Sequence, residues 1–339
     1  MRHNEILRVT ASIVLCILFL TVGCTKPAEK PAQTKIESEE QKQTVMLALK
    51  FIPNDSTTYK VTTDADNSLT WEGIDSNKPK GFTGGHTGRK SEIIFTQQIQ
   101  NIDDKGNAIA KITIKQLKYL LTVKNDITMD FDSSRQQDLQ NPLNKLIGQS
   151  YTIEMTASGE VSEIIDVNDA RAAIKGTSAA DKTAVNFLSD EAIMERHKIP
   201  ALPASDKNQL RTGDNWSNIK SFSFTMMGSK AYEKIYTLQE IKDVDNRRIA
   251  IAEMQAVPSA ERAKELHKEQ SASFFANMSD NTETYTGELK LDLTNGKVEE
   301  YREKLITEWL IVDPNPKEGR QPAALKMGAV RSYSIEKID

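Results

Sequence analysis

Apolar and polar residues alternate along most of the chain after residue 45. Residues 91–102 and 108–115 both follow this pattern, which is typical of strands with one buried face. Residues 103–107 (DDKGN) separate them and have the composition of a hairpin turn. The apolar phase slips at Gln116, which predicts a β-bulge. The pattern therefore predicts a bulged antiparallel pair in this part of the chain.

Two further hairpins follow the same alternation. A Ser-Gly turn separates residues 151–157 from 160–167, and a Thr-Asn-Gly turn separates 288–293 from a strand that starts at Lys297. Residues 298–310 fit helical spacing as well as strand parity. The Asn-Gly sequence just before them favours the strand, because this dipeptide is a strong hairpin signal.

Part of this pattern is repeated along the chain. Phe-Thr-Gln-Gln at 95–98 is echoed by Tyr-Thr-Leu-Gln at 236–239, and an Ala-Ile-Ala sequence follows each. The repetition predicts two related β-rich halves, 45–167 and 214–339, although similar hairpins also resemble each other by chance. We therefore predict a mainly β (α+β) fold with long, curved antiparallel strands, half-barrel-like, and peripheral helices.

Helical periodicity is confined to two segments. Residues 181–198 have Asp181 as a candidate N-cap, and residues 259–275 start with Pro258-Ser259, which is a good helix start. The first segment belongs to a helical connector, 168–213, that also contains a stiff Ile-Pro-Ala-Leu-Pro sequence. The second segment is thin in apolar residues, so we expect an exposed helical insertion in the second half.

The N-terminus has the organisation of an export signal. Basic residues precede an apolar run of 14 residues, 9–22. This run is too short to span a bilayer core, which needs about 20 residues, and fits a signal peptide over 1–23. The polar, Pro-containing residues 24–44 cannot bury apolar surface. They predict a flexible linker with a reach of about 25 Å.

Residues 20–24 (LTVGC) resemble the lipobox of bacterial lipoprotein signals, in which a small residue precedes an invariant cysteine. Cleavage between Gly23 and Cys24 would remove Cys16 and leave Cys24 as the single cysteine of the mature chain. The resemblance implies a diacylglycerol thioether on Cys24, often with an N-acyl chain, which gives stable anchoring. Thr21 departs from the pattern, because leucine is usual there. The alternative is an uncleaved anchor with an incidental cysteine.

The predicted compartment follows from this lipid. We expect a cell-envelope protein attached to a membrane through its N-terminal lipid. Thr25 follows the cysteine, where an Asp usually retains proteobacterial lipoproteins in the inner membrane. Its absence favours the periplasmic face of the outer membrane if the organism has two membranes.

Bulk composition excludes several classes of protein. The 339 residues are 38% apolar, and their mean hydropathy of −0.51 excludes a polytopic membrane protein. The net charge of −4, with both signs mixed, gives no footprint for nucleic acid and no polybasic patch for anionic lipid. Membrane attachment therefore has to be covalent.

None of the local motifs predicts a catalytic, cofactor or metal site. The Gly-rich segment 81–91 lacks the spacing of a phosphate loop and leads into a strand, so it predicts a flexible loop. Residues 64–68 and 130–134 begin like calcium loops but lack the later Gly and Glu, and so predict strand-end turns. Ser217 and Lys220 match Ser-x-x-Lys without its partner motifs. The mature histidines, His86, His197 and His267, are widely scattered.

Several weak motifs together resemble a functionally uncharacterised family of bacterial envelope lipoproteins. They are Leu49-Lys50-Phe51, Tyr59-Lys60, Asp132-Ser133, Gly148-Gln149-Ser150-Tyr151, Gly159-Glu160-Val161, Leu202-Pro203 and Gly213-Asp214-Asn215-Trp216. The resemblance implies architecture and compartment only. Within it, Gly213-Asp214 is expected to form a turn and Trp216 to anchor the core of the second half.

Three functional hypotheses remain open. The first is a non-enzymatic envelope lipoprotein that binds a hydrophobic ligand or an envelope partner, because curved sheets can enclose a cavity. The second is a structural or assembly protein that acts through an exposed sheet edge. The third is a hydrolase with a site dispersed in the sequence. A cavity on the inward face of the strands would separate the first hypothesis from the second.

Overall fold

The computed structural model describes residues 44–73, 78, 82–224, 228–259, 279–312 and 324–338. All of them belong to one unit, Lys42–Asp339. The predicted signal peptide, Gly23, Cys24 and nearly all of the linker lie outside the described residues, as does most of the predicted helix at 259–275.

One large antiparallel sheet of twelve strands dominates the described residues. Its strands run in the order β7-β6-β4-β3-β2-β14-β13-β12-β11-β10-β9, and β5 pairs with β4. Their bounds are β2 (Ser56–Glu72), β3 (Gly85–Ile102), β4 (Ala108–Val123), β5 (Asp126–Asp132), β6 (Ser150–Met155), β7 (Val161–Asp166), β9 (Asn215–Phe224), β10 (Gly228–Val244), β11 (Arg247–Pro258), β12 (Ser279–Asp292), β13 (Lys297–Val312) and β14 (Ala324–Lys337). A separate small pair joins β1 (Val45–Met46) to β8 (Gln209–Leu210).

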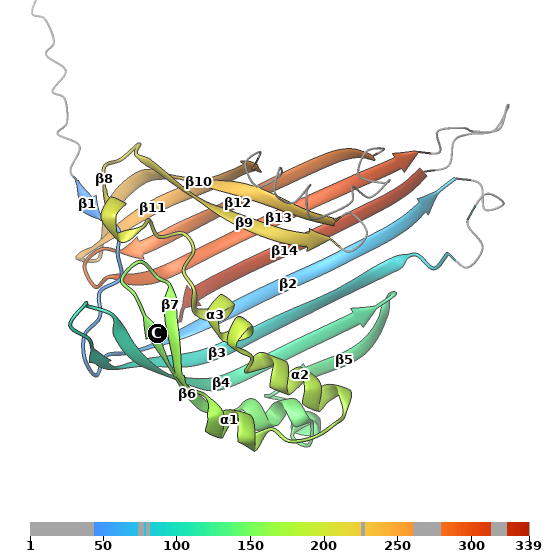
Figure 1. Ribbon diagram of the computed structural model, residues 1–339, viewed down its shortest axis with the longest axis horizontal. Helices are drawn as coiled ribbons and strands as arrows, with labels where there is room; N and C mark the ends of the chain where they lie inside the picture. Colours follow the sequence, from blue (N-terminus) through green and yellow to red (C-terminus); the bar gives the residue numbers. More distant parts are fainter. Residues whose placement is uncertain are drawn as a thin grey trace, which may run out of the picture. The chain divides into compact units, whose positions relative to one another are not determined.

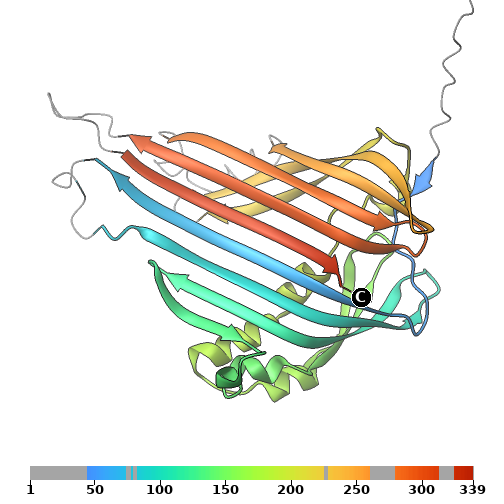
Figure 2. The ribbon, with the colours of Figure 1, turned by 180° about the vertical axis from the view of Figure 1, so that it is seen from behind.

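The predicted mainly β fold is confirmed. The sheet is curved, and its end strands β7 and β9 do not pair with each other among the described strands, so it stays open. Figure 1 shows the helices in front of the sheet, and Figure 2, from behind, shows the strands in front with the helices partly hidden behind and below them. The helices therefore lie on one face, where β9 and β10 also curl over the sheet (Figure 1).

The predicted hairpins form where the turn residues place them. Asp103 accepts hydrogen bonds from the backbone N–H groups of Lys105 and Asn107 and so closes the β3–β4 turn. The bulge near Gln116 is also confirmed: Ile94 pairs with Gln116, but Phe95 pairs with Ile114. The extra residue restores the buried phase of β4 beyond the bulge. Residues 298–310 are strand, as the Asn-Gly turn predicted.

The two predicted halves occupy adjacent parts of the sheet. Strands β2 to β7 form one part and β9 to β14 the other, and β2 pairs with β14 at the junction. Hence the first long strand of the first half lies beside the last strand of the second. Descent of the two halves from a duplication stays a prediction.

The predicted single helix over 181–198 is wrong in its boundaries and its cap. The structure has α2 (Ala179–Phe187) and α3 (Asp190–His197), preceded by a short α1 (Asn168–Ala173). Ser178 is the N-cap of α2, and Asp181 completes a capping box from the N3 position. Ser189 starts α3 because its hydroxyl accepts from the Ala192 N–H, which interrupts the helical run.

One predicted loop and one predicted strand-end turn are strand instead. Residues 85–91 of the Gly-rich segment belong to β3, and residues 64–68 belong to β2, where Asp66 pairs with Gly88. The backbone hydrogen bonds of the ladder do not require apolar side chains, so the pairing of β2 with β3 continues through these polar residues. The prediction for 130–134 is confirmed, because Asp132 ends β5 and accepts from the Ser134 N–H.

A segment at 44–55 crosses the turns at one end of the sheet. The Leu49 N–H donates to the Ala157 carbonyl (2.8 Å), and the Lys50 N–H donates to the Gly296 carbonyl (2.9 Å). Gly296 has a φ of +63°, and a Cβ there would lie 2.3 Å from the Lys50 nitrogen. The segment thus joins both parts of the sheet at their hairpin turns.

Candidate functional site

The helix-bearing face of the sheet has a partly open cavity of about 1520 Å³. Its floor comes from β2, β3, β10, β13 and β14, and one wall comes from β9. The helices α2 and α3 and the residues that follow them, 198–207, form the cover. The inward face of the strands therefore leaves open space between the sheet and its cover.

Strand registration gives the cavity floor an ordered chemistry. Ile93 and Val61 are paired and buried, and they form an apolar row. Because side chains of one face recur every second residue, the next row holds Ser91, Thr63 and Tyr333. The floor thus becomes more polar along the strands.

The row that follows is basic. Ala65 pairs with Arg89 on β3 and with Arg331 on β14, and all three line the cavity. Arg89 is exposed, whereas Ile93, four residues further along the same face, is 3% exposed. The floor therefore changes from an apolar, covered end to a basic, open end.

Hydrogen bonds hold the cover to the sheet. The Tyr333 hydroxyl donates to the Arg196 carbonyl on α3 (3.0 Å). The Trp216 indole N–H donates to the Ala201 carbonyl (2.9 Å), and its ring stacks on Tyr236. The cover is thus attached to β14 in the middle of the sheet and to β9 at its end.

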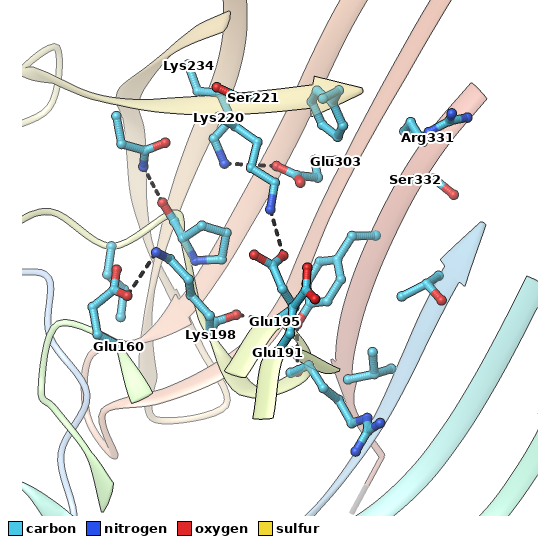
Figure 3. Close-up of a pocket in the computed structure, with 18 of the residues that line it drawn as sticks. Glu160, Glu191, Glu195, Lys198, Lys220, Ser221, Lys234, Glu303, Arg331 and Ser332 are labelled. Carbon is cyan, nitrogen blue, oxygen red and sulfur yellow. Dashed lines mark hydrogen bonds and ion pairs between the residues drawn. The ribbon is translucent and has the colours of Figure 1, made fainter. Parts of the chain in front are cut away.

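Ion pairs add to these attachments. Figure 3 shows Lys220 of β9 bound to Glu195 of α3 (2.6 Å) and Lys198 bound to Glu160 (2.9 Å). All four side chains line the cavity and are partly or well exposed. Such exposed pairs contribute only about 0–1 kcal/mol each, so they orient the cover more than they stabilise it.

A buried charged pair lies in the floor beneath β9. Lys234 is 1% exposed, and its Nζ lies 3.0 Å from Oε2 of Glu303, whose side chain is 10% exposed (Figure 3). The Tyr301 hydroxyl donates to the same carboxylate oxygen and lies 3.1 Å from the Tyr236 hydroxyl. Burial lowers the pKa of Lys234, and the charge of Glu303 opposes that shift.

The same burial acts on the tyrosines of this cluster. The pKa of Tyr301 is raised well above its usual value by burial and by the negative charge of Glu303. Tyr301 therefore stays protonated and donates its hydrogen bond to Glu303. The cluster is a closed internal network at the edge of the cavity.

His197 is a buried packing residue. Its Nε2 lies 2.6 Å from the Tyr151 hydroxyl, and its ring meets the ring of Phe95 edge-on at 4.6 Å. Burial, with a smaller effect of the Arg196 charge, lowers the pKa of His197 well below its usual value of 6.5. The imidazole is therefore neutral in the folded protein and attaches the end of α3 to the sheet.

This burial predicts that acid destabilises the protein. Because the folded pKa of His197 lies below its unfolded value of 6.5, the unfolded chain binds more protons below that pH. His197 does not lower the free energy of unfolding above about pH 6.5. Below that pH it lowers the free energy of unfolding by up to about 1.4 kcal/mol per pH unit. Urea denaturation at a series of pH values from roughly 7.5 to 5 measures this slope, because the range spans the unfolded-state pKa of His197. His197→Gln is expected to flatten the slope. Equal slopes in the wild type and His197→Gln would contradict this assignment.

The remaining candidate residues do not come together. Ser217 donates to Glu233, whereas Lys220 binds Glu195, and an odd spacing on β9 puts the two on opposite faces. His86 contacts Asp66, and His267 lies outside the described residues. Within the described part of the chain, no group of three His, Cys, Asp or Glu side chains is arranged to hold a metal ion. No described helix is long and apolar enough to cross a membrane.

The sequence motifs missed the charged residues of the cavity. Lys234 stands between Tyr232 and Tyr236, and Glu303 stands between Tyr301 and Leu305, at positions that share the buried parity. A charged residue among the buried positions of a strand was the signal that could have been used. The sequence alone does not show that Lys234 and Glu303 meet, because that depends on how the strands pair.

The fold and cavity define a class of protein: one curved antiparallel sheet with a covered, ligand-sized cavity on one face. The chain belongs to a family of unknown function, DUF6263, whose model matches residues 105–298, more than half of the 339 residues. No curated protein matches the chain.

Two solved structures are similar to parts of the chain. One, titled "Lipid-protein interactions in lipovitellin", has a TM-score of 0.40 at 11% identity. The match covers 86% of this chain and 26% of the lipovitellin chain. The present chain thus spans about a quarter of that protein. The other is DynF from the dynemicin biosynthesis pathway of Micromonospora chersina, with a TM-score of 0.18 at 6% identity, covering 93% and 94% of the two chains.

Proposed function

We propose that this protein is a lipid-anchored envelope lipoprotein that binds an amphipathic small molecule and catalyses no reaction on it. The graded floor of the cavity carries this proposal. An apolar chain fits the row of Val61 and Ile93, and a polar group fits the open end near Arg89 and Arg331. A purely apolar ligand would leave the basic row without a partner.

The size of the cavity supports a ligand larger than a metabolite. Pockets for drug-sized ligands typically have volumes of about 300–1,000 Å³. The present cavity, at about 1520 Å³, exceeds that range and is covered by α2, α3 and residues 198–207. An acyl chain with a head group matches both its volume and its graded lining.

The inward face also distinguishes between the functional hypotheses. A protein that acts only through a sheet edge needs no cavity, whereas here the strands and their cover enclose one. The described lining residues include no histidine, so they do not form a Ser-His hydrolase site. These observations favour the ligand hypothesis.

The proposed lipid on Cys24 would place the cavity near a membrane. The linker of residues 24–44 has a random-coil reach of about 25 Å, and the segment that follows it is fixed to the hairpin turns. The lipid would thus keep the cavity close to a membrane surface, which is a source of amphipathic molecules.

Filling the cavity tests the proposal. Ala65 lies between Arg89 and Arg331 in the basic row of the floor, so Ala65→Trp puts an indole into the open space of the cavity. Native mass spectrometry of the full chain, released from membranes and mixed with decanoate or decanol, measures the bound fraction. We expect the wild type to retain ligand and Ala65→Trp to lower its apparent affinity by roughly tenfold or more.

The matched control adds the same ring to the other face. Ile306 is 39% exposed and has the opposite parity on β13 from the buried Leu305. Ile306→Trp is expected to bind as the wild type does. A wild type that binds neither compound, or equal binding by Ala65→Trp, would overturn the proposal.

A further inference from the structure

Resting on the proposed function, we infer that Arg89 and Arg331 form an anion site for the carboxylate or phosphate group of the amphipathic ligand. Both side chains belong to the cavity lining and come from strands that flank β2. The site lies at the open end of the graded floor, where a head group would remain close to solvent.

The strand register sets the distance between the two cations. Arg89 and Arg331 each pair with Ala65, one from either side. Adjacent strands lie about 4.8 Å apart, so the two backbones are about 10 Å from each other. Only the Ala65 methyl group stands between them in this row. Two long guanidinium side chains can therefore reach one anion above Ala65.

Arg331 is held in place, but no ion pair with another described residue neutralises it. Its Nη1 donates to the carbonyls of Asp66 and Val330, and its Nη2 donates to Oδ1 of Asn67, all at 2.8 Å. The Phe224 ring also packs against the guanidinium, at 5.5 Å. These oxygens are uncharged, so the positive charge remains available to a ligand.

Arg89 completes the cationic pair. It is exposed, and within the described residues its side chain makes no hydrogen bond or ion pair, although its backbone is part of the ladder. Burial and the positive charge of Arg89 lower the pKa of Arg331, while the negative charges of Asp66 and Asp64 oppose that shift. Asp66 itself contacts His86. An anion between the two arginines would relieve their mutual repulsion.

The other cations of the lining already have partners or lie elsewhere. Lys198, Lys220 and Lys234 are each paired with a glutamate. Arg196 donates to the Tyr151 hydroxyl and a backbone carbonyl, and Lys207 lies in the cover and not on the sheet. Arginine also suits the role, because its planar donors match carboxylate and phosphate geometry.

Three ligands with one chain length test the inference. Native mass spectrometry of the full chain is titrated with decanoate, decyl phosphate and decanol. We expect the two anions to bind at least roughly tenfold more tightly than decanol, since a charge-assisted hydrogen bond has about that effect. Tighter binding of decanoate would indicate a fatty-acid carboxylate as the natural head group, and tighter binding of decyl phosphate would indicate a lipid phosphate.

Variants assign the effect to the two arginines. Arg89→Gln is expected to weaken anion binding roughly tenfold and to leave decanol binding unchanged. Arg331→Lys keeps the charge and loses the paired donors, so a smaller loss is expected. The matched control is Lys90→Gln, at the neighbouring exposed residue of opposite parity.

The outcomes separate the two levels of the proposal. Binding of all three ligands with equal affinity, unchanged by Arg89→Gln, would overturn the anion site and leave the ligand-binding function standing. If none of the three ligands binds, the proposed ligand-binding function itself would be overturned. An equal loss in Lys90→Gln would show a general effect of surface charge and so also overturn the anion site.

Discussion

Replacing Lys234 by methionine is expected to lower the free energy of unfolding by about 3–5 kcal/mol. The substitution leaves the Glu303 carboxylate in a site where its side chain is 10% exposed and its cationic partner is gone. The Tyr301 hydroxyl still donates to that carboxylate, but one neutral donor does not replace an ammonium group. The loss would therefore arise from the uncompensated charge.

A double variant separates this cause from simple loss of packing. Glu303→Gln removes the charge and keeps an acceptor for Tyr301, so Lys234→Met with Glu303→Gln is expected to recover most of the stability. Urea denaturation of the full chain measures all three proteins. Lys242→Met is the control on the same strand, because the Lys242–Glu240 pair is exposed and contributes about 0–1 kcal/mol. Equal losses in the single and double variants would contradict the charge argument.

Truncation of Trp216 to alanine is expected to cost about 3–5 kcal/mol. The side chain is 9% exposed, its ring stacks on Tyr236 with the centroids 5.5 Å apart, and its N–H binds the Ala201 carbonyl. The change therefore leaves a void between β9 and the cover and removes one attachment of the cover. Weaker ligand binding is expected to accompany the loss of stability.

Phenylalanine at the same position divides the two contributions. Trp216→Phe keeps a ring against Tyr236 and loses the hydrogen bond to Ala201, so a smaller loss of about 1–3 kcal/mol is expected. Thermal and urea unfolding give the stabilities, and the decanoate titration gives the affinity. If Trp216→Ala unfolded as the wild type does, Trp216 would not be the core anchor that its packing indicates.

The sequence predicted the fold best where turns and alternation are local. The turn at 103–107, the turn at 294–296 and the bulge near Gln116 all depend on residues close together in the chain. Each strand's alternation also indicated which of its residues face the core. The split between α2 and α3 was missed because Ser189 is an N-cap inside an otherwise helical pattern.

The cavity was harder to predict because it depends on pairing between distant strands. Arg89 and Arg331 come together only through β2, which pairs with β3 and, across the chain, with β14. Local alternation assigns each arginine to a face but does not say which residues are neighbours across the sheet. The same holds for Lys234 and Glu303, which β10 and β13 bring together.

The position of a bound ligand tests the central claim most directly. A photoactivatable diazirine analogue of decanoate, cross-linked to the full chain in its membranes and mapped by tandem mass spectrometry, reports that position. We predict adducts on the cavity-lining side chains of Val61, Ile93 and Leu202, and competition by unlabelled decanoate. Adducts concentrated on Ile306 and Leu310, which are exposed on the opposite face, or adducts that decanoate does not displace, would contradict a ligand site in the cavity.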